Sequence, residues 1–286
     1  MKIIIGTAQF GMDYGISNKQ GKMPKKFVSR IIDLAKKYEI DTLDTAPAYG
    51  DSEKRLGKLG VQDFKVISKI SEFSNEYSNI NNAIRSQIER SLERLNIQSI
   101  HGLLIHKSEH LLSNDGDKIY EALIAAKNEN LVKKIGVSVY SPEEILKIIS
   151  RYDVDMFQTP FNILDRRIET SGCLDILSKK SIEVHARSVF LQGLLLIPKY
   201  EMPNKFKHWS NIWNDWHDWL SENSISAVHA CLNFVLEHPQ INKIVVGIEN
   251  AEQLEEIVAL SNKSLSYKHP SIECDDINLI NPANWN

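Results

Sequence analysis

Cysteine is scarce in this sequence, and the few that occur are far apart. The three residues, Cys173, Cys231 and Cys274, form no Cys-x-x-Cys pair. This spacing argues against a disulfide framework and against a zinc site, so we expect no bound metal. Few and isolated cysteines suit a reducing compartment, and we expect the protein in the cytoplasm.

The sequence also lacks a large excess of positive or negative charge. Lysine and arginine number 34 against 37 aspartate and glutamate residues, which leaves a formal net charge of −3 without a basic block. Binding to nucleic acid needs a cationic patch, so we expect no nucleic-acid partner. No segment approaches the roughly 18 consecutive apolar residues of a membrane helix. The start, MKIIIGTAQFG, is too short an apolar run for a secretory signal. We therefore expect no membrane contact.

The sequence does contain a regular alternation of short apolar runs and amphipathic stretches. Eight runs are typical of strands, at 2–7, 41–45, 64–70, 100–106, 133–139, 155–161, 182–190 and 241–247. Helical periodicity follows them at 27–38, 51–60, 81–95, 117–130, 141–150, 173–180 and 251–261. Strands alternating with helices imply parallel βαβ units, and eight of them favour the α/β class and one closed (β/α)₈ TIM barrel.

An open, doubly wound sheet is the alternative fold. It would want a G-x-G-x-x-G turn after its first strand, and GTAQFG lacks that spacing. We therefore predict a single barrel domain over residues 1–286, with a C-terminal tail from about 262 to 286 packed against the barrel. A tryptophan-rich insert at 207–220 offers either an aromatic platform for a sugar or, as we favour, a helix that packs through Trp213, Trp216 and Leu220.

The stretch TLDTAPAYGDSE, residues 42–53, contains a carboxylate that surface chemistry does not explain. Asp51 and Glu53 suit a solvated loop, but Asp44 ends a strand beside Leu43 and small alanines. A buried lone carboxylate costs several kcal/mol unless a partner compensates it. Asp44 therefore requires a cation or a hydrogen-bond donor from another part of the chain.

The barrel supplies that partner, because the active sites of barrels lie at the C-terminal ends of the strands. Lys69 and His106 come at the ends of two further predicted strands, and Tyr49 lies in the loop after Asp44. A lysine at this rim favours the charged form of Asp44 and would lower the pKa of a nearby phenol. The four residues together predict a proton donor, Tyr49, aimed at an oxygen that gains negative charge, with His106 orienting a carbonyl.

Six motifs resemble the aldo-keto reductase family, in order and over nearly the whole chain: DTAPAYGDSE, VISKI, GLLIHK, IGVSVY, FQTPFNILDRR and VVGIENAEQLEEI. The resemblance implies a (β/α)₈ barrel that binds a nicotinamide cofactor and reduces an aldehyde or ketone to an alcohol. By motif position it implies the catalytic residues Asp44, Tyr49, Lys69 and His106. The segments GTAQFGMDYGI and ARSVFLQGLL resemble those of a bacterial branch of the family that is associated with carbohydrate and cell-surface polysaccharide metabolism.

The resemblance also implies the residues that bind the cofactor. Ser138 and Gln158 match positions that hold the nicotinamide carboxamide, whereas Val139 stands where the family usually has asparagine. Arg187 stands where an aromatic ring commonly stacks under the nicotinamide. It could stack there, reach the pyrophosphate, grip an acidic substrate group or pair with a rim carboxylate. The other cofactor positions implied are Thr7, Asp44, Ser188, Phe190, Gln192, Gly247, Glu249 and Gln253.

The choice of dinucleotide depends on the segment VGIENAEQLEEI. The 2′-phosphate of NADP is bound best by cationic side chains. This segment offers Glu249, Asn250 and Gln253, and none of the three is cationic. A carboxylate suits the free ribose hydroxyl of NAD. Family habit favours NADP, so we expect NADP, with NAD as the alternative. The expected substrate is a small carbonyl compound, for example a sugar derivative, and the oligomeric state stays open. A cofactor-sensing regulatory protein with little turnover is the rival function, because Val139 and Arg187 depart from the family pattern.

Overall fold

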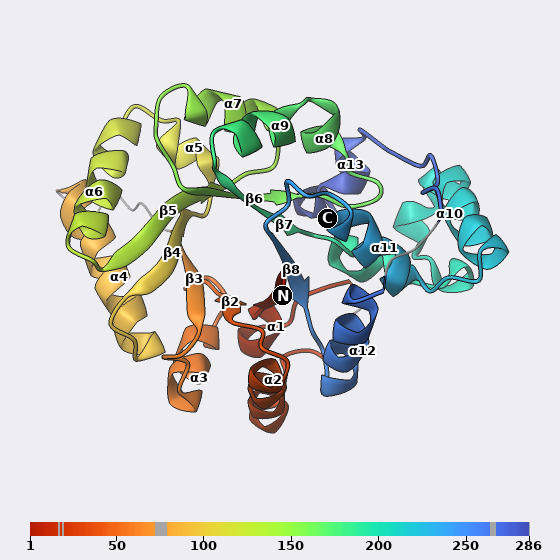
Figure 1. Cartoon of the computed structure of the whole chain (residues 1–286), viewed down its shortest axis with the longest axis horizontal. Helices are drawn as coiled ribbons and strands as arrows, with labels where there is room; N and C mark the ends of the chain where they lie inside the picture. Colours follow the sequence, from red (N-terminus) through yellow and green to blue (C-terminus); the bar gives the residue numbers. More distant parts are fainter. Residues whose placement is uncertain (17, 19, 72–78, 264–266, 286) are drawn as a thin grey trace.

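Eight parallel strands close into a barrel in chain order, with β8 returning to pair with β1 (Figure 1). The structure is a computed structural model, and it describes all residues except 17, 19, 72–78, 264–266 and 286. The strands are β1 (Ile3–Gly6), β2 (Thr42–Asp44), β3 (Lys65–Ile70), β4 (Ile100–Ile105), β5 (Val132–Ser138), β6 (Met156–Pro160), β7 (Glu183–Arg187) and β8 (Lys243–Gly247). The predicted (β/α)₈ barrel is confirmed.

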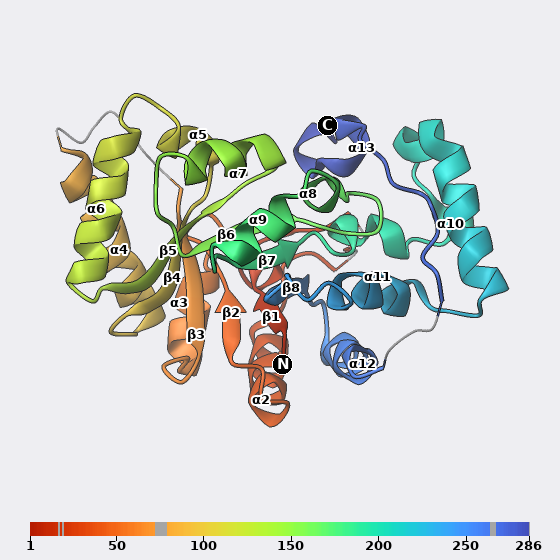
Figure 2. The same cartoon turned by 45° about the horizontal axis from the view of Figure 1, so that its top comes forward.

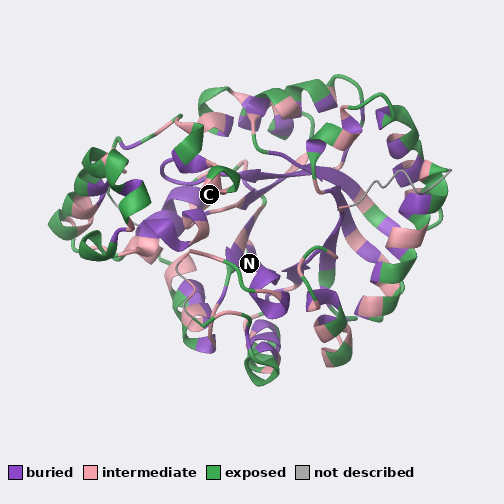
Figure 3. Cartoon of the chain, turned by 180° about the vertical axis from the view of Figure 1, so that it is seen from behind, coloured by how far each residue is buried: buried purple, intermediate pink, exposed green. Residues whose placement is uncertain are grey.

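Helices surround the barrel, and the strands between them are buried almost throughout (Figure 3). The α-helices are α1 (Ala8–Gly11), α2 (Lys25–Lys37), α3 (Ser52–Leu59), α4 (Ile80–Leu95), α5 (Ser108–Leu111), α6 (Gly116–Asn128), α7 (Pro142–Ile149), α8 (Arg167–Thr170), α9 (Cys173–Lys179), α10 (Ser210–Glu222), α11 (Ala227–Leu236), α12 (Ala251–Ser261) and α13 (Ile277–Ile280). Four 3₁₀ turns complete the described elements: η1 (Leu191–Leu196), η2 (Lys199–Glu201), η3 (Asn204–Trp209) and η4 (Pro282–Asn284). Helix α11 was not among the predicted helices, because its run ACLNFVL is almost wholly apolar and lacks a polar face.

The inside of the barrel forms a floor beneath the strand ends. Side chains two residues apart on a strand point to the same face. Ile67, Leu104 and Met156 form a buried cluster separate from the large core. They stand two residues before Lys69, His106 and Gln158 respectively. This cluster therefore supports the polar side chains at the C-terminal end of the barrel.

The tryptophan-rich insert packs as a helix rather than presenting its rings to solvent. Helix α10 lies at the outer edge of the molecule, beyond α11 (Figure 1, Figure 2). Trp213 and Trp216 are buried, and their indole nitrogens donate to the carbonyl oxygens of Phe206 at 2.8 Å and Leu195 at 3.0 Å. This confirms the packing interpretation for these two residues, so they offer no platform for a sugar.

The described part of the C-terminal tail runs back along the barrel. The amide of Cys274 donates to the carbonyl of Leu164 at 2.9 Å, and Leu279 and Ile280 of α13 are buried. Residues 264–266 and 286 of the predicted tail lie outside the described residues. Within the described ranges, no helix is both long and apolar enough to cross a membrane.

One predicted boundary was wrong at the seventh strand. We predicted a strand over 182–190, but β7 ends at Arg187, and Ser188 has a left-handed backbone with φ of 55°. Leu191 and Gln192 also have positive φ values, of 48° and 52°. The chain therefore turns sharply here instead of extending the sheet, and it lines a cavity with Ser188, Val189, Phe190, Gln192 and Gly193.

Candidate active site

The partner of Asp44 is Lys69. Asp44 is the last residue of β2, and the ammonium of Lys69 on β3 lies 2.8 Å from both of its carboxylate oxygens. The side chains are 3% and 1% exposed, so the pair lies out of solvent. Lys69 also donates to the carbonyl of Thr45 at 3.1 Å, and the amide of Gln158 donates to Asp44 at 2.7 Å. The carboxylate is thus compensated by one cation and one amide donor, as a buried charge requires.

Tyr49 and His106 join this pair at the mouth of the barrel. The ammonium of Lys69 lies 4.9 Å from the centroid of the Tyr49 ring. The rings of Tyr49 and His106 meet edge to face, with centroids 6.1 Å apart and planes at 85°. Nδ1 of His106 lies 2.9 Å from the hydroxyl of Ser71. The structure therefore brings together all four residues that the sequence motifs selected for catalysis.

Burial changes the proton affinities of this group, and one expectation was wrong. We expected Lys69 to lower the pKa of Tyr49. Burial instead raises the pKa of Tyr49 well above its ordinary value, the charge of Asp44 adds to this, and Arg187 opposes it. Burial also lowers the pKa of Lys69, against the opposing effect of Asp44. Because Asp44 neutralises the ammonium, little net positive field is left to favour a tyrosinate.

His106 is held in its neutral form. Burial and the nearby charge of Lys69 lower its pKa to about 4. At neutral pH the imidazole is therefore uncharged. It can carry a single ring proton for a hydrogen bond to a carbonyl oxygen, and the bond at Nδ1 to Ser71 selects which nitrogen carries it.

The loop that carries Tyr49 is fixed by a very close approach to the chain after β1. A Cβ on Gly11 would lie 1.7 Å from the carbonyl oxygen of Tyr49, so only glycine fits there. Gly50 faces the same contact with φ of 59°, and its own Cβ would lie 2.3 Å from the carbonyl oxygen of Gly11. These two glycines set the height of Tyr49 above the barrel.

Glu53 anchors the other end of this loop, and our expectation of a solvated residue was wrong. Its side chain is 2% exposed. One carboxylate oxygen accepts from Ser68 at 2.7 Å, and the other accepts from Arg94 at 2.7 Å and from Ser91 at 3.3 Å. Ser68 precedes Lys69 on β3 and points to the opposite face, toward α3 and α4. Glu53 therefore ties the loop to the strand that supplies the lysine.

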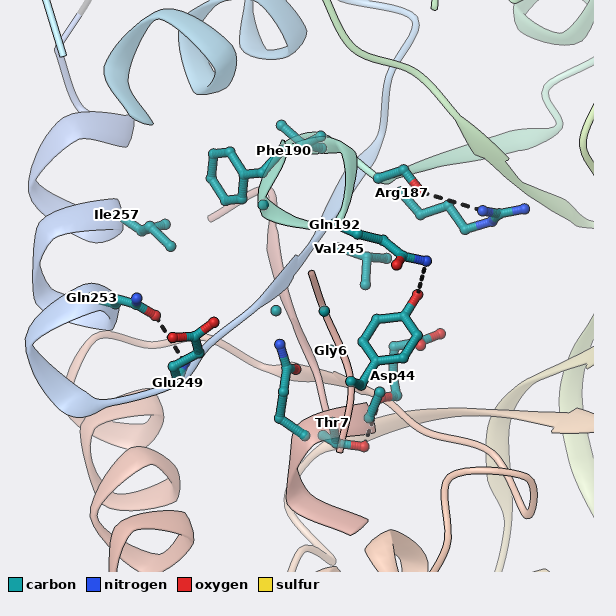
Figure 4. A pocket seen from close by; sticks show the side chains of 18 of the residues that line it. Gly6, Thr7, Asp44, Arg187, Phe190, Gln192, Val245, Glu249, Gln253 and Ile257 are labelled. Atoms are coloured by element: carbon teal, nitrogen blue, oxygen red, sulfur yellow. Dashed lines mark hydrogen bonds between the residues drawn. The ribbon is translucent and has the colours of Figure 1, made fainter. Parts of the chain in front are cut away.

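A cavity opens beside this cluster and extends to α12 (Figure 4). Counted with its open mouth, it has about 1130 Å³ of space. Most of the predicted site residues line it: Thr7, Asp44, Tyr49, Gln158, Arg187, Ser188, Phe190, Gln192, Gly247, Glu249 and Gln253. Lys69, His106 and Ser138 do not line it. Ser138 is only 4% exposed, and Lys69 lies behind Asp44.

Several lining residues were missed from the sequence. Gln9 and Tyr14 come from the segment after β1, and Glu256 comes from α12. The hydroxyl of Tyr14 accepts from the side-chain amide of Gln192 at 3.1 Å, which links the loops after β1 and β7 across the cavity. The pKa of Tyr14 is raised to about 12, mainly by burial. The polar, aromatic composition of QFGMDYG was the available signal for this wall.

The end of the cavity at α12 is shaped to accept an extended polar ligand. Asn250 caps the helix by accepting from the amide of Gln253 at 2.8 Å, and the Gln253 side chain accepts from the amide of Glu249 at 2.8 Å. Gly247 ends β8 without a side chain, and a Cβ there would lie 2.9 Å from Gln9. Because glycine has no Cβ, the floor of the cavity stays open between β1 and β8. These residues fit a dinucleotide that runs from Tyr49 to α12.

Arg187 occupies the opposite wall. Its guanidinium lies 4.2 Å from the centroid of the Tyr140 ring. It donates to the carbonyl of Val139 at 3.1 Å and to the hydroxyl of Ser188 at 3.4 Å. No described carboxylate forms an ion pair with it, so it is not the carboxylate-paired rim arginine we had considered. The two departures from the family pattern, Val139 and Arg187, therefore contact each other.

Comparison with known proteins agrees with this fold. The model of the family described as "Aldo/keto reductase family" matches residues 2–272. The chain belongs to the aldo/keto reductase family and is an NAD(P)-dependent oxidoreductase.

Two curated relatives and one solved structure illustrate the similarity. L-glyceraldehyde 3-phosphate reductase of Escherichia coli K12 is 23% identical over 91% of this chain and 83% of its own length. L-galactose dehydrogenase of Arabidopsis thaliana is 25% identical over 77% of this chain and 73% of its own length. The holo form of an aldo-keto reductase from Bacillus halodurans is 20% identical, with a TM-score of 0.75 over 93% of this chain and 88% of that one. The structural likeness supports the same barrel.

Proposed function

We propose that this protein reduces the carbonyl group of a small aldehyde or ketone to an alcohol, with Tyr49 as the proton donor. The position of Lys69 between the Asp44 carboxylate and the Tyr49 ring carries this proposal, because Asp44 and Tyr49 both line the cavity. A reduced nicotinamide cofactor supplies the hydride to the carbonyl carbon when it is bound. The side chains of the protein supply the proton and the orientation.

Each side chain of the cluster has a distinct role in the proposed reaction. Tyr49 keeps its proton at neutral pH, as an ordinary phenol does, and its raised pKa extends this protonated range to higher pH. The acid is therefore present in the form that the reaction consumes. Lys69 holds its ammonium against the Tyr49 ring and so helps to position the proton donor. Neutral His106 donates a hydrogen bond that orients the carbonyl. Asp44 holds Lys69 in place and balances its charge.

The lining near α12 favours NADH as the cofactor, although family habit pointed to NADPH. Glu249, Gln253 and Glu256 line this end of the cavity, and among the described lining residues the single arginine or lysine is Arg187 on the other wall. Carboxylates repel a 2′-phosphate but accept hydrogen bonds from a free ribose hydroxyl. We therefore propose that NADH binds more tightly than NADPH.

Substrate size and polarity follow from the cavity and from the relatives. The names of two relatives specify L-glyceraldehyde 3-phosphate and L-galactose, both small, polar compounds that carry hydroxyl groups. Gln9, Tyr14 and Gln158 give the cavity of this chain hydroxyl and amide groups suited to such a compound. A sugar or sugar derivative is accordingly the substrate class we propose.

Turnover is the direct test of this function. Purified protein should oxidise NADH when it is supplied with aldehydes, ketoses or sugar derivatives, measured by loss of nicotinamide absorbance and by detection of the alcohol product. Cofactor binding without oxidation above the rate of a Tyr49→Phe variant would contradict the proposal and favour the sensor.

Fluorescence titration with NADH and NADPH tests the dinucleotide choice. Glu256→Lys should improve NADPH binding more than NADH binding. Glu121→Lys on the distant helix α6 makes the same change of net charge and should alter neither. A wild-type protein that binds NADPH more tightly would contradict the choice of NADH.

A further inference from the structure

Arg187 is a cation that faces the cavity without a described anionic partner. The guanidinium has five N–H donors. One donates to the carbonyl of Val139, and another donates to the hydroxyl of Ser188. The second of these bonds is long, at 3.4 Å. The remaining donors keep the planar, forked geometry that matches a carboxylate or a phosphate.

The guanidinium is held in position by its neighbours. It stacks on Tyr140 at 4.2 Å, and the backbone carbonyl of Tyr140 in turn accepts from Arg167 at 3.0 Å. Arg167 is fixed by two bonds to Asp165, both 2.8 Å long. Stacking on an aromatic face stabilises a cation and restricts its plane. Arg187 is thus oriented before any ligand arrives, which lowers the entropy cost of binding.

The charge acts on the proton-donor side of the cavity rather than on the α12 side. Figure 4 shows the guanidinium of Arg187 directed away from Glu249, Gln253 and Ile257. Its field reaches Tyr49, Tyr14, His106 and Lys69. The other cation of this group, Lys69, is committed to Asp44. Among the described residues that line the cavity, Arg187 is the single lysine or arginine, so an anionic group bound there would meet this cation.

We infer that Arg187 binds an acidic group, a carboxylate or a phosphate, on the carbonyl substrate, so that the protein prefers acidic carbonyl compounds over their neutral analogues. This inference rests on the proposed carbonyl reduction at Tyr49. It makes Arg187 a specificity-determining residue. In this family an aromatic ring commonly occupies the position of Arg187 and stacks under the cofactor. In this protein the residue at that position binds the substrate instead.

Matched substrates that differ in charge test the inference. Erythrose 4-phosphate against erythrose is the phosphate pair, and 4-formylbenzoate against its methyl ester is the carboxylate pair. Wild-type protein should show a lower KM for at least one acidic member than for its neutral analogue, and the pair that responds identifies the acidic group. Arg187→Gln should raise the KM of that member by about 10- to 100-fold, as expected for loss of hydrogen bonds to a charged group. It should leave the neutral member and the dissociation constant of NADH unchanged.

Two control variants separate this role from structural effects. Arg187→Lys keeps the charge but loses the fork, and should restore part of the affinity. Arg151→Gln removes another arginine that stacks on a tyrosine, Tyr152, away from the cavity, and should change no kinetic constant. Equal losses for charged and neutral substrates, a weaker affinity for NADH, or no change in Arg187→Gln would each overturn the inference.

A binding measurement keeps the inference testable if no carbonyl compound is reduced. Erythritol 4-phosphate and 4-(hydroxymethyl)benzoate resemble the acidic alcohol products. With NADH present, at least one should raise the melting temperature of the wild-type protein but not of Arg187→Gln. Absence of turnover with this shift retained would defeat the proposed reduction while supporting the acidic site. Absence of the shift, with neutral compounds reduced, would defeat the acidic site alone.

Discussion

The ammonium of Lys69 lies 2.8 Å from each carboxylate oxygen of Asp44, and the same ammonium lies 4.9 Å from the Tyr49 ring. One lysine therefore compensates a buried carboxylate and borders the proposed proton donor. Gln158 reaches the same carboxylate from β6, 114 residues along the chain. Stability and chemistry are coupled at this point, so substitutions here should change both.

Replacement of Lys69 should destabilise the protein and abolish reduction. Lys69→Met leaves Asp44 buried with an amide donor but without a cation, and breaking such a pair costs on the order of 3 to 5 kcal/mol of unfolding free energy. Lys65→Met on the same strand is the control. Its pair with Asp41 is half exposed and contributes about 0 to 1 kcal/mol. Chemical denaturation should also show strong coupling between Lys69→Met and Asp44→Asn in a double-mutant cycle, and additive effects would argue against the pair.

Loss of the Tyr49 hydroxyl should remove catalysis without removing the fold. Tyr49→Phe keeps the ring against His106 and should lower kcat by about 10²- to 10⁴-fold, the range for loss of a general acid. The dissociation constant of NADH should be nearly unchanged in a fluorescence titration. Tyr14→Phe removes another hydroxyl from the same cavity and should cost less than about tenfold. Retained activity in Tyr49→Phe would exclude it as the proton donor.

The pH dependence of reduction distinguishes a raised from a lowered pKa at Tyr49. Burial raises this pKa above its ordinary value, so the phenol stays protonated from neutral pH up to at least about pH 10. The kcat for reduction should accordingly show no decline from ionisation of Tyr49 below about pH 10. A decline near pH 7 to 8 that is absent in Tyr49→Phe would instead support a phenol activated by Lys69.

His106 should make the folded state less stable in acid. Its pKa is lowered from 6.5 to about 4, so between these values the unfolded chain binds a proton that the folded protein does not. The contribution of His106 is complete above pH 6.5 and declines as the pH falls, by about 3 kcal/mol at pH 4 and below. Unfolding free energies at pH 7 and pH 5 should therefore differ less in His106→Gln than in the wild-type protein. An equal difference in both would contradict the shifted pKa.

A side chain at position 11 should displace Tyr49. Gly11→Ala forces the loop away from its position, because the new Cβ would lie 1.7 Å from the Tyr49 carbonyl oxygen. We expect loss of activity together with a lower melting temperature. Gly172→Ala is the control, because its φ of 73° disfavours alanine but no atom lies within 4 Å of the new Cβ. It should cost about 1 to 2 kcal/mol of stability and leave kcat unchanged. Normal kcat in Gly11→Ala would show that the contact does not position Tyr49.

The sequence by itself determined the barrel and the location of the proposed proton donor. Periodicity is a local property, so the alternating strand and helix patterns indicated parallel units. Eight such units favoured a closed barrel, and the resemblance to a family implied the same fold. Asp44, Lys69 and His106 could be placed on one rim because each stands at or beside the end of a strand, and parallel strands share that end. Their catalytic roles stay predictions.

Only the tertiary structure decided how deeply each group is buried and what surrounds it. Burial reversed the expected pKa shift of Tyr49, and it turned Glu53 from a surface charge into an anchor for its loop. Ser138 is buried and does not line the cavity, whereas Tyr14 and Glu256 line it. Arg187 stacks on Tyr140 beside the backbone of Val139. These relationships depend on contacts between residues far apart in the chain, and the energy of a charge depends on that surrounding medium, which no local pattern records.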